Sequence, residues 1–513
     1  MNPNGKMMEF DLIVIGSGPG GYKAAITAAH LGAKVALVEQ GLAGGTCLNQ
    51  GCIPKETLLH LASLIEDVNG LQGLGLVGSI SGDFPAAMAH KDEVIGGIRA
   101  NFSVWLKRLG IRVIYGTARL VDPHWVEVDL SAHLGAAGDL PIDLTTTRLL
   151  RLNANRIIIA SGSEPKTLAC CQTDGEKIIS SRDFMFNLKH RPDSVLCVGG
   201  GAVGVELGFL LHQFGTRVCI AELGDRLLNT PRIPERASVV LERKFQRLGI
   251  EVRKETTVQS CTINGKGVDV TFLDGTRASF DCVLVAVGRK PCTTGLGLED
   301  IGIQLTPDGH IHTSEYLETS IPGIYAVGDV KPGPMTANAA LHDAKVAAAN
   351  AVQGNQLQAN YFKVPFVIHS ALEIAAVGLT EEQAETAGFD ADVARASFGG
   401  SGKARACHDY EGSIEVVYDA QTGQLLGGCI VGDEAGEQIH MLSAACQSSR
   451  GLWFFKDQSY SHPSWCEELE TAIDPCTSAF ARSEKTLFRP GILADLVKEG
   501  HKALTDEICR IFY

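Results

Sequence analysis

No stretch of the 513-residue sequence is apolar for long enough to cross a membrane. The run Phe10–Ile15 is interrupted by Asp11 and ended by Gly16, so it is too short for the hydrophobic part of a secretion signal. The longer run Val195–Leu211 contains Glu206 and five glycines, and its pattern predicts a strand, a turn and a helix. The absence of both signals leads us to expect a cytoplasmic protein.

An excess of positive charge is also missing, because 45 Lys and Arg stand against 59 Asp and Glu, for a net charge of −14. An acidic surface argues against nucleic acid or an anionic membrane as the main partner, and we expect no insertion into a membrane. Hydrophobic residues make up 45% of the chain and charged residues 20%, which is typical of a folded globular protein. The length predicts about three domains.

Cysteine is too sparse for a disulfide scaffold, with 15 residues at irregular spacing and an odd total. No pair of Cys-x-x-Cys motifs indicates zinc, and we expect no metal. These features favour a reducing compartment, with most cysteines buried as small apolar side chains. We interpret the adjacent Cys170 and Cys171 as a loop feature without an assigned role.

One pattern of residues occurs twice, over Asp11–Glu39 and Ser194–Glu222. Each copy reads as an apolar strand, a glycine-rich turn, a helix and a second strand that ends in glutamate, and both turns have the form G-x-G-x-x-G. The glycines are Gly16, Gly18 and Gly21 in the first copy and Gly199, Gly201 and Gly204 in the second. A strand before the motif and a helix after it indicate two dinucleotide-binding units.

The residue types in each copy suit a dinucleotide. The first glycine permits the tight turn, the second lets backbone approach a pyrophosphate, and the third lets the helix pack on the strand. The helix N-terminus then offers its unpaired N–H groups to the phosphates. Glu39 and Glu222 can accept hydrogen bonds from a ribose, and Glu222 would repel a 2′-phosphate, which favours NAD over NADP. Two packing turns without a ligand are the alternative, but two sites most simply indicate a flavin and a nicotinamide.

Three further strands end in small residues that can lie beside a ligand at the edge of a sheet. They are Ile157–Ser163 with Gly162, Val283–Gly288 with Gly288, and Ile324–Asp329 with Asp329. Each is equally explained by a buried strand and its turn. Beyond residue 360 the pattern becomes that of an α+β domain without a nucleotide motif. Its expected elements are a strand-like stretch Val364–Val377, hairpin strands Ile414–Tyr418 and Leu425–Val431, and a helix Glu437–Gln447.

Cys47 and Cys52 directly follow the first nucleotide unit. On an ideal helix their Cα atoms would lie about 8.6 Å apart, beyond the limit of roughly 6.8 Å for a disulfide. A bridge therefore needs a distorted helix start, and Gly51 and Pro54 fit one. A bridge beside a flavin in a reducing cell favours a redox role, whereas the spacing alone leaves a structural or free pair equally open.

The motif GGTCLNQGCIP at Gly44–Pro54 resembles the active-site signature of the flavin disulfide reductases, the pyridine nucleotide-disulfide oxidoreductases. The two glycine motifs, IIIASGS, VLVAVGRKP and GIYAVGDV stand where that family has them, and His462–Glu467 resembles its His-Pro…Glu signature. The resemblance covers roughly residues 8–475. It is strongest to the dihydrolipoamide dehydrogenases, through GYKAAITAAHLGAKVALVE, VPFVIHSALEIAAVGLTEEQ and Glu222. Mercuric reductases are less similar because the tail lacks paired cysteines, and glutathione reductases normally prefer NADPH.

The resemblance implies a homodimer with FAD and a redox disulfide between Cys47, the interchange thiol, and Cys52, the thiol nearest the flavin. It implies that His462 of one subunit serves as acid and base for the other, with Glu467 orienting the imidazole. Asp329 would hold the ribitol or phosphate region of FAD, and Glu39 its adenosine ribose. Two alternatives stay open: His462 as an ordinary loop histidine, and Glu467 as the last residue of a capping box that begins at Ser464.

The expected fold is α/β, with two doubly wound Rossmann-like dinucleotide-binding domains and a C-terminal α+β dimerisation domain. The FAD domain would span residues 1–160 and 289–360, the NAD domain 161–288, the dimerisation domain 361–482 and a tail 483–513. The implied reaction is NAD-linked oxidation of dihydrolipoamide on a lipoyl-bearing carrier protein, such as one of a 2-oxoacid dehydrogenase or glycine cleavage complex. The alternatives are another FAD-dependent disulfide reductase and a non-catalytic flavoprotein subunit that serves assembly.

Some positions depart from the family pattern. The family's Lys after the second cysteine pairs with a Glu that matches Glu206, but here that position is Glu56 and the Lys is Lys55. We therefore expect Glu56 to face Glu206, with one carboxyl protonated or Lys55 turned inward; the alternative places Glu56 in solvent. The family's Thr-His-Pro-Glu is replaced by Ser370–Glu373, and its His-Ala-His-Pro by Tyr460–Pro463. Apolar residues of the tail, Ile492–Val497 and Ile511–Tyr513, are expected to pack on the dimer, on a partner or on their own subunit.

Overall fold

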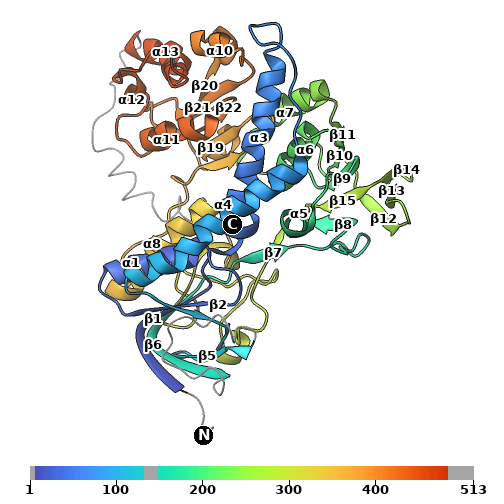
Figure 1. The fold of residues 1–513 in the computed structure, drawn as a ribbon. Helices are drawn as coiled ribbons and strands as arrows, with labels where there is room; N and C mark the ends of the chain where they lie inside the picture. Colours follow the sequence, from blue (N-terminus) through green and yellow to red (C-terminus); the bar gives the residue numbers. More distant parts are fainter. Residues whose placement is uncertain (1–5, 132–147, 483–513) are drawn as a thin grey trace.

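A computed structural model describes residues 6–131 and 148–482 (Figure 1). The predicted tail, 483–513, lies outside these ranges. The first nucleotide unit forms β1 (Lys6–Ile15), α1 (Pro19–His30) and β2 (Val35–Glu39), as its pattern predicts. β1 lies at the centre of a seven-stranded sheet, parallel to β2 on one side and to β6 on the other. The other strands of this sheet are β3 (Arg112–Tyr115), β4 (Thr117–Asp122), β5 (Trp125–Asp129), β6 (Leu149–Ile159) and β17 (Ile324–Ala326).

Small side chains let helices cover this sheet closely. α1 packs over β1 and β2, and α8 (Ala337–Gln353) lies beside it against β6 and β17 (Figure 1). Their facing alanines, among them Ala24, Ala28, Ala344 and Ala347, are fully buried in one cluster with Leu12 and Val14 of β1. Apolar burial of this kind is the main favourable term in folding, and here it holds the glycine turn before α1 against the sheet edge.

The second nucleotide unit forms β9 (Ser194–Val198), α6 (Ala202–Gln213) and β10 (Arg217–Ala221), which confirms the strand, turn and helix predicted for Val195–Leu211. These strands belong to a parallel sheet in the order β11-β10-β9-β15-β8. The remaining elements of this half are β7 (Ser163–Pro165), β8 (Ile178–Ser180), α5 (Ser181–Asn187), α7 (Glu235–Leu248), β11 (Glu251–Arg253), β15 (Cys282–Val285), β16 (Arg289–Pro291), and an antiparallel meander of β12 (Val258–Ile263), β13 (Val268–Phe272) and β14 (Arg277–Phe280).

A third, antiparallel sheet has the order β18-β19-β22-β21-β20. The stretch Val364–Val377 is two strands rather than one, β18 (Phe366–Ile368) and β19 (Ile374–Gly378), because residues 369–373 turn between them. The predicted hairpin is β21 (Ser413–Asp419) and β22 (Leu425–Val431), and the predicted helix is α11 (Ala435–Cys446). The other elements here are α9 (Glu381–Thr386), β20 (Ala391–Ser397), α10 (Gly402–Cys407), α12 (Trp453–Lys456) and α13 (Glu467–Arg482).

Two long helices join the three sheets. α3 (Cys52–Gly70) packs against α6 of the second nucleotide unit and against α4 (Phe84–Arg108) (Figure 1). The short α2 (Gly45–Gln50) precedes α3 and carries the first cysteine of the motif. No helix in the described ranges is both long and apolar enough to cross a membrane.

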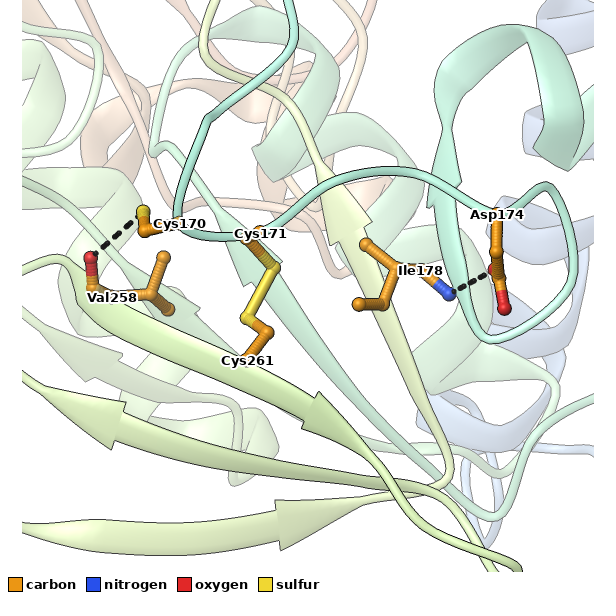
Figure 2. The surroundings of a disulfide bond; sticks show 6 residues. All are labelled: Cys170, Cys171, Asp174, Ile178, Val258 and Cys261. Carbon is orange, nitrogen blue, oxygen red and sulfur yellow. Dashed lines mark hydrogen bonds between the residues drawn. A yellow bond between two sulfur atoms is a disulfide. The ribbon is translucent and has the colours of Figure 1, made fainter.

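One disulfide joins Cys171 to Cys261, with Cα atoms 5.0 Å apart (Figure 2). It links the turn at residues 168–171 to β12, and the amide of Cys261 donates to the carbonyl of Cys170. Cys170 and Cys171 lie in a turn, as interpreted from the sequence, and Cys171 has a structural role that spacing could not indicate because its partner is distant in sequence. Twelve other cysteines of the described chain are thiols. Five of these twelve thiols are buried, which is fewer than the majority that we predicted: Cys197, Cys219, Cys282, Cys429 and Cys446.

Candidate functional site

The backbone breaks between the two cysteines of the motif. α2 ends at Gln50 and α3 begins at Cys52, with Gly51 between them at φ −134° and ψ −110°. A Cβ on Gly51 would lie 3.0 Å from the carbonyl oxygen of Thr46, which disfavours any larger residue at this break. The predicted distortion of the helix start is confirmed. It brings the two side chains together as a hydrogen-bonded pair of thiols.

The pKa values of the two thiols shift in opposite directions. The hydrogen bond from Cys47 and then the charge of Lys55 lower the pKa of Cys52, although partial desolvation works in the other direction. The same hydrogen bond and burial raise the pKa of Cys47. Cys52 is also the first residue of α3, where the positive end of the helix dipole favours an anion. In this reduced arrangement Cys52 is the more acidic of the two thiols, because its pKa is lowered while that of Cys47 is raised.

Lys55, and not Glu56, occupies the position opposite Glu206. Its Nζ lies 2.8 Å from Glu206 Oε1, and the two side chains are 18% and 6% exposed. Burial alone would lower the pKa of Lys55, but the attraction and hydrogen bond of Glu206 raise it above its ordinary value, so the ammonium stays charged. The expectation that Glu56 faces Glu206 is wrong. Lys55 turns inward, which is one of the two expected ways to neutralise Glu206. Glu56 points away, and its side chain is 57% exposed.

A histidine that the sequence analysis missed completes this charged group. Nδ1 of His369 lies 2.9 Å from Glu373 Oε1 and 4.0 Å from Glu56 Oε2. Its backbone amide donates to Glu206 Oε1 over 3.0 Å, so that one oxygen serves both His369 and Lys55. The signal was a His and a Glu four residues apart directly after an apolar stretch, in the segment where the chain departs from the family pattern.

His462 and Glu467 form a second pair, on the part of the chain that follows α12. Nδ1 of His462 lies 2.8 Å from Glu467 Oε1, while Glu467 Oε2 accepts from the amide of Ser464 at 2.7 Å. Glu467 thus serves both roles that the sequence left open, one with each oxygen. The side chain of His462 is 81% exposed, and no hydrogen bond or ion pair within the described ranges joins it to Cys47 or Cys52.

The first glycine turn is built as its motif predicts. Gly16 has φ +100°, and a Cβ there would lie 2.3 Å from the carbonyl oxygen of Ala160; a Cβ on Gly21 would lie 1.7 Å from the oxygen of Gly16. Both positions therefore require glycine. Glu39 accepts from the amide and hydroxyl of Ser17 with Oε2, at 2.8 and 2.6 Å, and from the amide of Gly41 with Oε1, at 2.6 Å.

The second turn repeats this geometry. Gly199 has φ +106° and a Cβ there would lie 2.5 Å from Ala286 O, while one on Gly204 would lie 1.9 Å from Gly199 O. Glu222 accepts from the amides of Gly200, at 2.6 Å, and Gly224, at 2.7 Å. Each carboxylate is therefore fixed at the end of its second strand by the backbone of its own turn.

The middle glycine of each turn, Gly18 or Gly201, differs from the other two because open space lies where its Cβ would be. The nearest atom to a Cβ on Gly18 would be 3.9 Å away, and nothing lies within 4 Å of one on Gly201. Both residues are the N-caps of twelve-residue helices, and neither N-terminus has a side-chain cap. Open backbone before an uncapped helix N-terminus fits the pyrophosphate of a dinucleotide at both turns.

Asp329 and the two strand-end glycines lie around one small hydrogen-bonded group. Asp329 Oδ2 accepts from the hydroxyl of Ser163 at 2.6 Å, and Arg289 donates to that hydroxyl and to the Ser163 carbonyl, each at 2.7 Å. The carbonyl of Gly162 accepts from Cys292 N, and that of Gly288 from Lys166 N. β7 and β16 thus tie together the ends of strands from both nucleotide units. The described residues include no group of three or more His, Cys, Asp or Glu arranged for a metal ion.

Comparisons with known proteins match nearly the whole chain. The profile described as "Pyridine nucleotide-disulphide oxidoreductase" matches residues 10–344, and that of its dimerisation domain matches residues 364–473. A dihydrolipoyl dehydrogenase from Chlorobaculum tepidum is 35% identical over 92% of this chain and 98% of its own length. One from Thermus scotoductus is 36% identical over 91% and 97%. A leghemoglobin reductase from Glycine max is 31% identical over 90% and 87%.

Solved structures agree with these matches. LpdA from Mycobacterium tuberculosis superposes with a TM-score of 0.81 at 25% identity, over 91% of this chain and 99% of its own. The HOCl-induced flavoprotein disulfide reductase RclA from Escherichia coli superposes with a TM-score of 0.77 at 26% identity, over 90% and 99%. The expected α/β fold with its dimerisation domain is confirmed.

Proposed function

This chain belongs to the pyridine nucleotide-disulphide oxidoreductase family, and we propose that it oxidises protein-bound dihydrolipoamide to lipoamide with reduction of NAD⁺. It is an NAD-dependent flavoprotein oxidoreductase that uses FAD and NAD. The observation that carries the dihydrolipoamide assignment is the hydrogen-bonded Cys47–Cys52 pair at the start of α3, with Lys55 beside it. The names of the relatives from Chlorobaculum and Thermus support the same substrate.

The first glycine turn suits FAD and the second suits NAD; we call these two turns, each with its glutamate, the FAD and NAD cradles. Gly16, Gly18 and Gly21 with Glu39 and Asp329 would hold FAD, because this turn lies directly before the cysteine motif. Gly199, Gly201 and Gly204 with Glu222 would hold NAD. FAD bound at the first turn would supply a two-electron carrier between the cysteine pair and NAD⁺ at the second. We also propose the domain limits 1–160 with 289–360, 161–288 and 361–482 for the FAD, NAD and dimerisation domains.

The cysteines perform the chemistry from their oxidised, disulfide form. His462 removes a proton from one thiol of dihydrolipoamide, and the resulting thiolate attacks Cys47 Sγ. The Cys47–Cys52 bond breaks and Cys52 leaves as a thiolate, for which its lowered pKa suits it. The second substrate thiol releases its proton to solvent, and the resulting thiolate attacks the substrate sulfur bound to Cys47. Lipoamide is released, and the Cys47 sulfur takes a proton back from His462.

We propose that His462 acts on the cysteines of a second copy of the chain. The histidine is exposed on the single chain, and Glu467 fixes its imidazole so that Nε2 is the nitrogen that meets the substrate. The dimerisation domain of the family covers residues 364–473 and so contains both residues. A homodimer in which each subunit completes the site of the other is therefore the functional form.

The partner in this proposal is a lipoyl group on a carrier protein, as in a 2-oxoacid dehydrogenase or glycine cleavage complex. One observation favours a second function: Ser370 and the exposed Glu56 depart from the family pattern. These changes favour, as the second candidate, a reductase for another disulfide substrate, and RclA from Escherichia coli, a HOCl-induced flavoprotein disulfide reductase, has a similar fold.

A substrate panel separates the two functions. The purified holoenzyme is assayed for NADH-dependent reduction of lipoamide, glutathione disulfide and other disulfides, with Cys47→Ser as the control that lacks the interchange thiol. We expect kcat/KM for lipoamide to exceed that for each other disulfide by at least about 100-fold, and Cys47→Ser to retain FAD without turnover. A higher value for another disulfide would assign the second function, and full activity in Cys47→Ser would end the disulfide mechanism.

A further inference from the structure

Lys55 lies between two carboxylates that compete for its charge. Glu206 holds it at 2.8 Å on the buried side, next to Cys52. Glu56, the next residue along α3, also attracts the ammonium electrostatically but is 57% exposed. The ammonium of Lys55 adds to the hydrogen bond from Cys47 in favouring the thiolate form of Cys52. An outward movement of Lys55 toward Glu56 would therefore weaken this form.

The imidazole of His369 lies beside Glu56 and beside a third carboxylate, Glu373. Its Nδ1 lies 2.9 Å from Glu373 Oε1 and 4.0 Å from Glu56 Oε2. The hydrogen bond to Glu373 raises the pKa of His369 above its ordinary value, against burial and the repulsion of Lys55. Asp433 and Glu434, which precede α11, interact electrostatically with Glu373 and add to the negative charge around it.

The backbone of His369 contacts Glu206, the buried partner of Lys55. The amide of His369 donates to Glu206 Oε1 at 3.0 Å, the oxygen that also accepts from Lys55. The hydroxyl of the next residue, Ser370, donates to the carbonyl of Val205 in α6 at 2.9 Å and is buried. The turn between β18 and β19 is therefore fixed to α6, and the backbone of His369 is held beside the Lys55–Glu206 pair.

We propose that His369 is a positioning residue for Cys52: its imidazolium engages Glu56 and Glu373, and this leaves Lys55 on Glu206, beside the Cys52 thiolate. The inference deepens the proposed function, in which Cys52 is the leaving group of the disulfide exchange. When His369 loses its charge, Glu56 and Glu373 draw Lys55 away and Cys52 takes up a proton more readily.

The test measures the thiolate directly and needs no lipoyl substrate. In FAD-loaded Cys47→Ser protein, where serine keeps a hydrogen-bond donor, the charge-transfer absorbance between the Cys52 thiolate and the flavin is followed against pH. We expect His369→Gln to move the midpoint of this profile up by about one pH unit. Restoring a cation with His369→Lys should return the midpoint to its original value.

A second change separates positioning from mere structural support. Glu56→Gln added to His369→Gln removes the competitor and should bring the midpoint back, whereas Glu385→Gln on α9, which removes the same charge from another exposed position, should not. An unchanged midpoint in His369→Gln overturns the proposal, and so does a shift that Glu56→Gln fails to reverse. If the shifts appear but the holoenzyme does not reduce lipoamide, only the proposed substrate is wrong.

Discussion

Nζ of Lys55 lies 2.8 Å from Oε1 of Glu206, and this contact ties the first turn of α3 to α6. It therefore connects the cysteine motif to the helix that begins at the second nucleotide cradle. Lys55 on α3 and the glycine turn before α6 are thus held by two helices that pack on each other. Four predictions follow from the geometry of this and other sites.

Glu222 should control the choice between the two nicotinamide cofactors. Its carboxylate is fixed by the amides of Gly200 and Gly224, so a 2′-phosphate would meet a negative charge that cannot easily turn away. We expect Glu222→Arg to change the NADH to NADPH ratio of kcat/KM by at least about 100-fold in favour of NADPH. Glu222→Gln, which removes only the charge, should give an intermediate ratio. Equal use of both cofactors by the unchanged enzyme would contradict the role.

The middle and last glycines of the second turn should behave differently when each becomes alanine. A Cβ on Gly201 meets no protein atom within 4 Å, whereas one on Gly204 would lie 1.9 Å from the carbonyl oxygen of Gly199. Gly201→Ala should therefore keep its Tm but raise the KM for NADH about tenfold or more. Gly204→Ala should lower Tm, because the backbone must move. A lower Tm in Gly201→Ala with unchanged KM would show that this turn does not bind the cofactor.

Asp409 should make the protein less stable as the pH rises from about 4 to 6. Burial, followed by repulsion from Asp433, raises its pKa from 3.8 to about 6. The folded state then binds more protons than the unfolded state in this window, so stability falls with rising pH. We expect Asp409→Asn to stabilise the protein at pH 7 by about 1–2 kcal/mol, allowing for its partial exposure.

The gain from Asp409→Asn should shrink as the pH falls and be small near pH 4, close to the ordinary pKa of 3.8, because the carboxyl then becomes protonated in the unfolded state as well. Thermal melts of both proteins between pH 4 and 8 measure it. Asp225→Asn, at an exposed position of the second nucleotide half, is the matched control and should show no such pH dependence. A constant difference in Tm across the range for Asp409→Asn would contradict the raised pKa.

The Cys171–Cys261 bond should contribute to stability even though it lies outside the catalytic motif. It closes a long loop, and cross-links of this kind typically contribute about 2–4 kcal/mol. We expect Cys261→Ala to lower the free energy of unfolding by that amount in urea denaturation under oxidising conditions. Cys170→Ala, which removes a neighbouring exposed thiol, should change little. In a strong reductant, the free energy of unfolding of the protein without substitutions should approach that of Cys261→Ala. If it does not, the bond is not formed in solution.

The parts that could be predicted from sequence are those in which a few neighbouring residues set the geometry. The two cradles need glycine at Gly16 and Gly199 because only a positive φ closes the turn, and the sequence shows this directly. The break at Gly51 is local in the same sense. Lys55 shows the limit: one position along a helix changes the direction of a side chain by about 100°, yet a long lysine still reaches Glu206.

Contacts between distant segments could not be predicted in this way. His369 acquires its charged neighbours only when the turn after β18 docks on α6, and nothing near it in sequence indicates that docking. The pairing of Cys171 with Cys261 is one of many that 15 cysteines allow. The tail, with Ile492–Val497 and Ile511–Tyr513, lies outside the described residues, and its packing stays a prediction.

The same disulfide has a mechanical consequence. Its cysteines are 90 residues apart, so the bond closes a covalent ring that contains the whole NAD cradle, from Gly199 to Glu222. A chain pulled from its two ends in an optical trap transmits force through the bond and leaves the ring slack. The oxidised molecule should therefore unravel to a contour length about 300 Å shorter than the reduced one. A single proteolytic cut inside the ring would likewise leave both fragments joined.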